Sequence, residues 1–395
     1  MRIGMFTDNY SPLINGVVTS IQMLAKGLQA YGHEVFIFTY DFYDKGCTDK
    51  PEIYKNNVVI LESRKIYIKS LKDFRLSTAT RDKIRIIKSY NLDVIHVHTE
   101  FSAGKLAAKA SKSLHIPLVH TFHTLYDDYL RYFSKFLDKH YKWALRGALN
   151  GFMKPINKRS IITIVPTKKV LELAPFYHIT GDVRVVPTGI DLSKFLEEKN
   201  LDLTEYLKLK YHLSNDFIFV FIGRISDEKS LDTVIKCFAK SCRNLKAKLL
   251  IVGNGPALDN IKKLTNELEI SKQVVFTGFV DWTNVSDYYK LGDCFVNASS
   301  TETQGLTYIE ALASGLPLLV KNDECLTDVL VSGVNGVGID TEEELSSKMN
   351  EFVNDKALVE KLVLNTKNSV ENYTEMCYAR NVLKIYEQAI ELYSK

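Results

Sequence analysis

Two series of short apolar runs, each run followed by a stretch of helical periodicity, constrain the fold of this chain. Continuous runs rich in β-branched residues are typical of buried parallel strands, and helices that alternate with them cover both faces of the sheet. We therefore predict an α/β chain with two doubly wound, Rossmann-like sheets. The first series contains RIGMFT, EVFIFT, VVIL, DVIHVH, PLVHTF and ITIVPT, with helices expected near 17–30, 78–90, 103–113 and 167–174. The second begins at FIFVFIG (217–223) and continues with AKLLIVG, QVVFTG, DCFVNAS, PLLV and NGVGID.

The length of the chain predicts two domains. It has 395 residues, more than the roughly 250–300 that one core usually serves. Between the two series lies VRVVPTGIDLSKFLEEKNL (183–201), whose proline, glycine and charges suit a linker. We predict an N-terminal domain over 1–190 and a C-terminal domain over 191–370, facing each other across a cleft. The stretch 371–395 is predicted to be an amphipathic helix that returns to the N-terminal domain.

Composition favours a cytosolic globular protein. Charged residues make up 25% of the chain and hydrophobic residues 46%, as in ordinary globular proteins. No apolar run approaches the about 18 residues that a transmembrane helix needs. The first residues, MRIGMFTDNYSP, read as a strand without a signal-peptide pattern. The six cysteines are scattered without a C-x-x-C pair, which indicates reduced thiols.

Charge is distributed unevenly along the chain. Residues 1–190 contain 28 Lys and Arg against 16 Asp and Glu, a net charge of +12, and the remainder contains 23 against 31, or −8. A basic half suggests an anionic partner, which is a nucleic acid, a phosphate-rich ligand or a membrane surface. Chance drift in a lysine-rich proteome explains the asymmetry equally well.

The first strand of the second series is followed by GRISDEK, which contains Arg224 and Lys229. Ligands of open α/β sheets bind beyond the carboxyl ends of the strands. Two cations at such a place can neutralise a diphosphate, Arg by a planar fork and Lys as a point charge. A surface salt-bridge cluster is an equally good interpretation. The later GNGP turn (253–256) is weak evidence for a ligand site.

The stretch SSTETQGLTYIEALASGLP (299–317) places Glu302 just before a predicted helix and Glu310 inside it. The helix is expected to open at Gln304, and its free N–H groups form an anion site. An ionised Glu310 among apolar neighbours needs hydrogen-bond donors, and vicinal sugar hydroxyls supply them. The two carboxylates then bind two sugars of one ligand, with its phosphates at the helix start between them.

The E-x7-E spacing, together with G-R-x-x-x-E-K upstream, resembles the retaining GT-B glycosyltransferases of sequence family 4, over nearly the whole chain. The resemblance implies that Glu302 binds the transferred hexose and Glu310 the ribose of a nucleotide sugar. It also implies that Arg224 and Lys229 hold the diphosphate. Backbone groups at the helix start and at the base-binding turn complete the implied donor site: Gln304, Gly305, Leu306, Thr307, Gly278, Phe279 and Val280.

In the N-terminal half, the same resemblance assigns two residues to the reaction centre. Gly16 lies at the first strand-to-helix turn, where a glycine allows close backbone approach. His123, in the T-F-H pattern, is implied to lie beside the donor hexose. His120, within the strand, is interpreted as a satisfied core residue. Asp127 and Asp128 either bind the acceptor or cap the next helix.

Metal chemistry is not indicated by the sequence. No D-x-D follows a strand end of the expected cleft, and no His/Cys cluster has metal-ligand spacing. We expect no cofactor, with the leaving diphosphate neutralised by Arg224, Lys229 and helix N–H groups. The family retains anomeric configuration, and no carboxylate base needs to be named.

Two basic-aromatic stretches, 63–88 and 129–160, suggest a membrane-facing acceptor domain. On the expected helix 129–147, aromatic residues share one face and cations flank it, as on an interfacial helix among anionic headgroups. The alternative is that the aromatic face packs on the sheet. A second such stretch, together with the opposite charge of the other domain, favours the membrane.

The segments HTFHTLYDDYLRY, KSLKDFRL and TETQGLTYIEALASG resemble a bacterial subgroup of the family, the 1,2-diacylglycerol 3-glucosyltransferases, except that Asp127 replaces Glu. This implies transfer of glucose from UDP-glucose to diacylglycerol by an enzyme peripheral to the inner face of the cell membrane. Galactose as the transferred sugar, a glycolipid acceptor and a soluble or polysaccharide acceptor stay open. A nucleic-acid-binding function leaves Glu302 and Glu310 unexplained.

Overall fold

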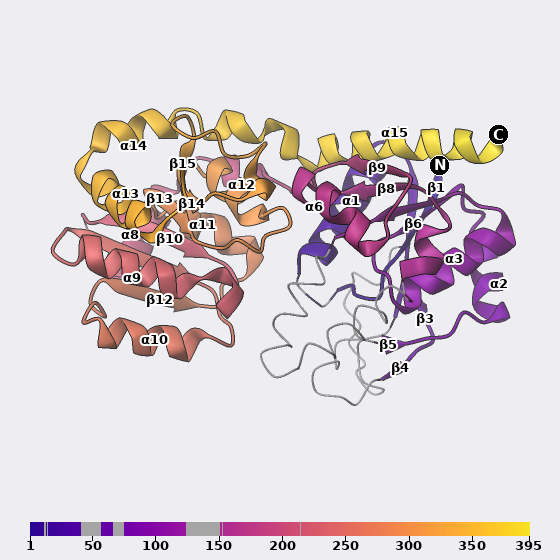
Figure 1. Ribbon diagram of the computed structural model, residues 1–395, viewed down its shortest axis with the longest axis horizontal. Helices are drawn as coiled ribbons and strands as arrows, with labels where there is room; N and C mark the ends of the chain where they lie inside the picture. Colours follow the sequence, from indigo (N-terminus) through magenta and orange to yellow (C-terminus); the bar gives the residue numbers. More distant parts are fainter. Residues whose placement is uncertain are drawn as a thin grey trace. The chain divides into compact units, whose positions relative to one another are not determined.

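The computed structural model describes residues 1–11, 13, 15–40, 57–65, 75–123, 151, 153–213 and 215–395 (Figure 1). The chain divides into two compact units. The first unit contains Met1–Ile190 together with Tyr373–Lys395, and the second contains Asp191–Asn372. No helix in the described part of the chain is long and apolar enough to cross a membrane.

A parallel sheet forms the centre of the first unit, and all six predicted runs of the first series are strands in it. In the described residues its order is β3-β2-β1-β6-β7-β8-β9, so the direction of strand succession reverses between β1 and β6. The strands are β1 (Arg2–Phe6), β2 (Glu34–Tyr40), β3 (Val58–Leu61), β6 (Val94–Val97), β7 (Leu118–Thr121), β8 (Ser160–Val165) and β9 (Asp182–Val185). A short antiparallel pair, β4 (Arg64–Lys65) and β5 (Arg75–Leu76), lies outside this sheet.

Strand β9 corrects the prediction that a linker begins at residue 183. Its residues pair in parallel with β8, from Ile162 opposite Asp182 to Val165 opposite Val185. The pairing adds β9 as the edge strand of the sheet. Half-buried edge strands do not need a continuous apolar run, which is why DVRV gave no strand signal.

Helices cover both faces of the first sheet. On one face, apolar residues of α1 (Gly16–Ala30) and α15 (Glu375–Ser394) pack against β1, β2, β6, β7 and β8. On the other face, α2 (Arg81–Ser89) and α3 (Ser102–Leu114) pack against the same sheet. The helix α6 (Lys168–Leu173) follows β8 in the sequence. The terminal helix α15, drawn in yellow in Figure 1, docks closely on α1, because a Cβ added to Gly27 would lie 2.6 Å from the Glu375 carbonyl oxygen.

The second unit is built on a second parallel sheet, with the order β12-β11-β10-β13-β14-β15 in the described residues. Every predicted run of the second series is one of its strands. The strands are β10 (Phe217–Ile222), β11 (Ala247–Val252), β12 (Val274–Gly278), β13 (Cys294–Asn297), β14 (Leu318–Lys321) and β15 (Gly336–Ile339). The direction of succession reverses between β10 and β13, so a topological switch point lies between these two strands.

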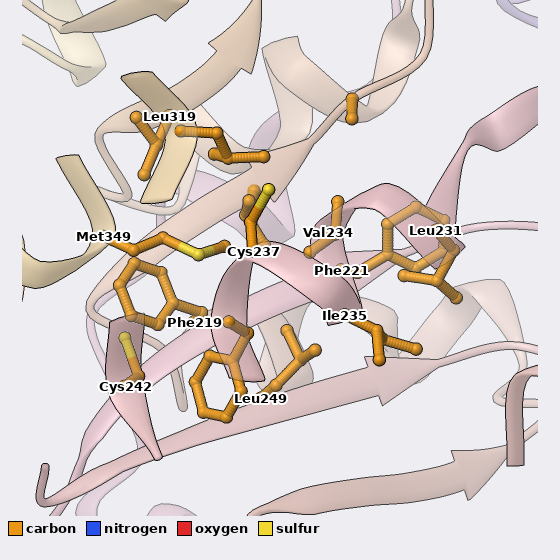
Figure 2. Close-up of a cluster of buried hydrophobic side chains, with 14 of the residues drawn as sticks. Phe219, Phe221, Leu231, Val234, Ile235, Cys237, Cys242, Leu249, Leu319 and Met349 are labelled. Carbon is orange, nitrogen blue, oxygen red and sulfur yellow. The ribbon is translucent and has the colours of Figure 1, made fainter. Parts of the chain in front are cut away.

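The helices of the second unit are α7 (Ser193–Leu196), α8 (Leu201–Lys210), α9 (Leu231–Cys242), α10 (Leu258–Glu267), α11 (Val285–Tyr289), α12 (Leu306–Ala313), α13 (Glu342–Asn354) and α14 (Lys356–Val363). Figure 2 shows the core on one face of the sheet, where Phe219 and Phe221 of β10 meet α9 and Met349 of α13. On the opposite face, Phe295 of β13 contacts the rings of Tyr289 and Tyr308, at 6.0 and 5.6 Å between centroids. These contacts seat α11 and α12 over the switch point.

The stretch after residue 190 is also packed rather than a free linker. Lys194 of α7 donates through Nζ to the Thr283 carbonyl oxygen at 2.9 Å, and Lys290 Nζ donates to the Lys194 carbonyl oxygen at 2.7 Å. Phe195 is buried and makes edge-on ring contacts with Trp282 and Tyr289. Residues 193–196 are therefore part of the second unit.

Candidate active site

The loops that follow β10 and β13 contain the charged residues predicted for the diphosphate and the hexose. Arg224 and Lys229 follow β10, and Glu302 follows β13. Because β10 and β13 flank the switch point of the sheet, their carboxyl ends open on the place where α/β sheets bind ligands. The sheet topology therefore brings together residues that are 73 positions apart.

Close backbone contacts fix the loops at this end of the sheet. Gly253, at φ 141°, lies so close to the preceding loop that an added Cβ would be 1.9 Å from the Gly223 carbonyl oxygen. Backbone N–H groups link the strand ends in sequence, from Gly223 to Val252 and from Gly253 to Gly278, each at 3.0 Å. The GNGP turn is thus a packing device between neighbouring strand ends.

Lys229 and Glu302 form an ion pair, with Lys229 Nζ 2.5 Å from Glu302 Oε1 and side-chain exposures of 23% and 14%. Two hydroxyls support the loops around this pair. Ser299 Oγ and Thr301 Oγ1 both donate to the Glu228 carbonyl oxygen at 3.2 Å. The β13 loop is therefore bound directly to the turn that presents Lys229.

The helix predicted to open near Gln304 is α12, and Gly305 is its N-cap residue, at φ 70°. An added Cβ on Gly305 would lie 2.2 Å from the Tyr308 ring, so a side chain at this position would displace that ring or the helix start. No side chain of the described residues caps this helix. The first N–H groups of a helix have no intrahelical acceptor, so Leu306 and Thr307 present backbone donors, together with the positive end of the helix dipole.

Glu310 is buried in α12 and accepts a hydrogen bond from the Tyr289 hydroxyl at 2.7 Å. Burial raises its pKa from 4.5 to about 7, and hydrogen bonds from Tyr289 and Trp282 oppose the rise. The sequence prediction assigned the required donors to a ligand, but the structure places two protein donors there. Neither Tyr289 nor Trp282 belongs to a recognisable sequence motif. Their contact with Glu310 could have been predicted only from the way in which α11 and the turn before it pack against α12.

The residues predicted to border the base lie at the end of β12, of which Gly278 is the last residue. Gly278 has φ 77°, and the Phe279 side chain that follows is 65% exposed. Val280 is half-buried, and Trp282 is 39% exposed. Of these aromatic residues, Trp282 is the one whose side chain hydrogen-bonds to Glu310. Arg224 is also exposed.

Gly16 and His123 belong to the first unit, and the other predicted site residues belong to the second. Gly16 is the first residue of α1, which Asn15 caps by accepting from the Val18 N–H at 3.0 Å. Gly16 is exposed, and an added Cβ would meet nothing within 4 Å. Packing within the protein therefore does not require a glycine here, and the role of Gly16 beside a ligand stays a prediction.

The half-buried His123 belongs to a cluster of otherwise buried polar groups at the carboxyl ends of β1, β6 and β7. The cluster was not predicted as a whole, although HVHTE (96–100) spans the end of the predicted strand DVIHVH and could have been found by inspecting strand ends. Its members are Asp8, His96, His98, Glu100, His120 and His123. Thr99 and the Ala103 N–H both donate to Asp8, whose pKa burial raises to about 6.

His120 is completely buried, as predicted, and its Nε2 lies 3.0 Å from Glu100 Oε1. Its Nδ1 has no partner in the described part of the chain, so the prediction of a satisfied core residue is only half right. Asp127, Asp128 and the expected helix 129–147 lie outside the described residues, as do residues 66–74 of the basic stretch 63–88. Among the residues that the structure describes, no group of three His, Cys, Asp or Glu is arranged to hold a metal ion.

Comparison with known proteins identifies the class. Residues 14–194 match the family described as Glycosyltransferase Family 4, and residues 207–369 match Glycosyl transferases group 1. The α-monoglucosyldiacylglycerol synthase of Acholeplasma laidlawii is 35% identical over 100% of this chain and 99% of its own length. The enzyme of the same name from Streptococcus pneumoniae is 34% identical over 94% of this chain and 83% of its own.

Solved structures with the same architecture cover nearly the whole chain. The Anabaena protein Alr3699/HepE in complex with UDP has a TM-score of 0.77 at 16% identity, covering 98% of this chain and 100% of its own. Sucrose-phosphate synthase from Thermosynechococcus elongatus has a TM-score of 0.76 at 18% identity and covers 99% of each chain. The two parallel-sheet units therefore define a glycosyltransferase of the GT-B fold. The chain belongs to glycosyltransferase family 4.

Proposed function

We propose that the protein transfers glucose from UDP-glucose to the 3-hydroxyl of 1,2-diacylglycerol at a membrane surface, retaining the α configuration and requiring no metal ion. The proposal of diacylglycerol as the acceptor is supported by the 35% identity, over the full chain, with an enzyme named α-monoglucosyldiacylglycerol synthase. The relative from Streptococcus pneumoniae bears the same name. The residues matched by Glycosyl transferases group 1, 207–369, include Lys229, Glu302 and Glu310.

The donor half of the proposal rests on the second unit. Lys229 and the N–H groups at the start of α12 supply positive charge and hydrogen-bond donors for a diphosphate. Glu310 accepts from the ribose hydroxyls, and the exposed Phe279 lies against the base. A protein with the same fold has been solved with UDP-glucose, so the fold accommodates this donor.

The proposed transfer step depends on stabilising the negative charge of the leaving diphosphate and needs no carboxylate base. As the bond between the anomeric carbon and the diphosphate oxygen breaks, negative charge develops on UDP, and Arg224 and Lys229 stabilise it. The acceptor oxygen attacks the same face of the sugar, and its proton passes to the departing phosphate oxygen. Glu302 positions the hexose through its hydroxyls.

The first unit supplies the proposed membrane contact. On and beside α2, the exposed cations Arg81, Arg85 and Lys88 accompany Ile86, which is 43% exposed, and Leu76, which is 57% exposed. Apolar side chains among cations suit a headgroup layer with anionic lipids. The stretch 129–147 adds a similar pattern, on the evidence of its sequence alone.

A transfer assay tests the proposal. The protein is incubated with radiolabelled UDP-glucose, UDP-galactose or GDP-mannose and with 1,2-diacylglycerol in anionic micelles that contain EDTA. Separate reactions offer monoglucosyl-diacylglycerol or a soluble sugar phosphate as acceptor. We expect label from UDP-glucose in a lipid with the mass of monoglucosyl-diacylglycerol and an α linkage. Label only in a diglycosyl lipid or a soluble product, or a β linkage, would refute it.

Two arginine variants give the assay an internal comparison. Arg224→Ala should lower turnover about 10²-fold or more, because it removes a charge from the developing diphosphate. Arg243→Ala changes another exposed arginine, which pairs with Glu269 at 3.8 Å, and this variant should turn over normally. Equal activity of the two variants would contradict the role of Arg224.

A further inference from the structure

We propose that His98 is a positioning residue for His123: His98 Nδ1–H donates to His123 Nε2 and leaves the Nδ1–H of His123 as the donor that faces a ligand. His98 follows β6 and His123 follows β7, which are neighbouring strands with Val97 opposite His120. His98 Nδ1 lies 3.1 Å from His123 Nε2. The ligand side of this inference rests on the proposed function, together with the expectation from the family resemblance that His123 lies beside the donor hexose.

Both rings are neutral, so the contact between them has one donor and one acceptor. Burial and neighbouring histidines lower the pKa of His98 well below 6.5, and burial and His120 lower that of His123 to about 3. Two arrangements are then available: either His98 donates from Nδ1, or His123 donates from Nε2. In a neutral imidazole, the hydrogen bond of one nitrogen determines the state of the other.

The second nitrogen of His98 decides between the two arrangements. His98 Nε2 is buried and has no hydrogen-bond partner in the described part of the chain. If His123 donated, this atom would carry a proton, and an orphaned buried N–H is among the rarest defects in folded proteins. If His98 donates, the atom carries only a lone pair. The remaining N–H then belongs to His123, whose residue is half-buried rather than fully buried.

Contacts with Phe6 and His96 hold the His98 ring in this orientation. Its backbone N–H donates to the Phe6 carbonyl oxygen at 2.9 Å, and its ring centroid lies 4.0 Å from that of His96. His96 is fixed at both nitrogens, by the Tyr386 hydroxyl at 2.6 Å and Thr121 Oγ1 at 2.7 Å. The orientation of His123 is therefore supported by a series of ring contacts that runs from Tyr386 of α15 through His96 to His98.

This arrangement assigns a chemical character to His123. A neutral ring with a proton on Nδ1 and an occupied Nε2 has no free lone pair for a general base. It can donate a hydrogen bond to a sugar hydroxyl or ring oxygen. His123 thus binds and orients the ligand, in agreement with a transfer step that passes the acceptor proton to the departing phosphate.

Histidine tautomers measured by ¹⁵N NMR test the inference without any substrate. The nine histidines are labelled selectively, and His123→Gln identifies the His123 signals. We expect His123 to be protonated at Nδ1 in the unaltered protein and in His98→Asn, whose amide nitrogen replaces Nδ1 as a donor. His98→Leu should abolish this preference, and His115→Asn, an exposed control, should leave it intact. Protonation of His123 at Nε2 in the unaltered protein, or an unchanged tautomer in His98→Leu, would overturn the proposal.

A kinetic comparison separates positioning from general damage. His98→Leu should lower kcat/KM about tenfold, the effect of one misdirected hydrogen bond, with UDP affinity unchanged, and His98→Asn should restore most of it. If His98→Leu fails to fold, His98→Gln replaces it, since its amide reaches the Nε2 position and not Nδ1. Equal losses in His98→Asn and His98→Gln would contradict the proposal. If the tautomers behave as expected but no acceptor is glucosylated, the proposed function fails and the role of His98 stands.

Discussion

Lys229 Nζ lies 2.5 Å from Glu302 Oε1, although the two residues follow different strands of the second sheet. An ammonium group has three donors, so Lys229 can keep Glu302 and still bind two phosphate oxygens. The pair therefore links the proposed sugar-binding carboxylate to the proposed diphosphate-binding cation before any ligand arrives. We interpret this ion pair as a preorganised link between the proposed sugar-binding part and the proposed diphosphate-binding part of the donor site.

The ion pair predicts that the effects of changing Lys229 and Glu302 are coupled. Lys229→Met and Glu302→Gln should each lower kcat by about 10²–10³-fold, the range seen when one charge-stabilising group is lost. The double variant should fall little further, because either single change already breaks the pair. Kinetics of glucosyl transfer measure all three. Fully additive losses would show that Lys229 and Glu302 work independently.

Glu310 predicts a pH-dependent stability. Its folded pKa is raised from 4.5 to about 7, so the folded state binds more protons than the unfolded state between these values. The free energy of unfolding should therefore fall as pH rises from 4.5 to 7. Glu310→Gln keeps a hydrogen-bond acceptor for Tyr289 but has no carboxyl group to ionise. Its free energy of unfolding should therefore equal that of the unaltered chain at pH 4.5 and be higher by up to about 3 kcal/mol at pH 8.

Urea unfolding followed through Trp282 measures this difference. One of the two tryptophans, Trp143, is changed to Phe so that the fluorescence reports the second unit alone. Measurements at pH 5 and pH 8 are compared for both proteins. A difference that stays constant across this range would mean that Glu310 does not titrate there.

The start of α12 predicts a strong dependence on one glycine. Gly305→Ala costs about 1–2 kcal/mol for the left-handed conformation, and its Cβ would also lie 2.2 Å from the Tyr308 ring. Gly333→Ala is the matched control, since Gly333 has φ 80° but free space around it. We expect Gly305→Ala to have the lower melting temperature and weaker UDP binding. Equal effects of the two changes would show that the N-terminus of α12 tolerates displacement.

The membrane proposal predicts a charge-dependent attachment. Changing Lys135, Lys139 and Lys142 together to Glu should release the protein from vesicles of phosphatidylglycerol, because each cation near an anionic surface contributes about 1 kcal/mol. The same change at three exposed lysines of the second unit, Lys240, Lys246 and Lys272, is the control. Vesicle sedimentation measures both, and UDP binding should be preserved. If the first variant binds vesicles as strongly as the control does, the membrane contact lies elsewhere.

Local sequence patterns predicted the strands because buried parallel strands are apolar throughout. DVRV was missed, since an edge strand needs no such run. The start of α12 was also predictable, because Gly305 and the apolar spacing lie within a few residues of each other. The partners of Glu310 were not, because Tyr289 reaches it from another helix. His98 was missed for the same reason, since its contact with His123 depends on the pairing of β6 and β7.

The most direct test of the central claim is a crystal structure of the protein with UDP bound in the absence of divalent ions. The account predicts the ribose at Glu310, the diphosphate between Lys229 and the N–H groups of residues 305–307, and the uracil against Phe279. UDP bound away from residues 302–310, or bound only through a coordinated divalent ion, would contradict it.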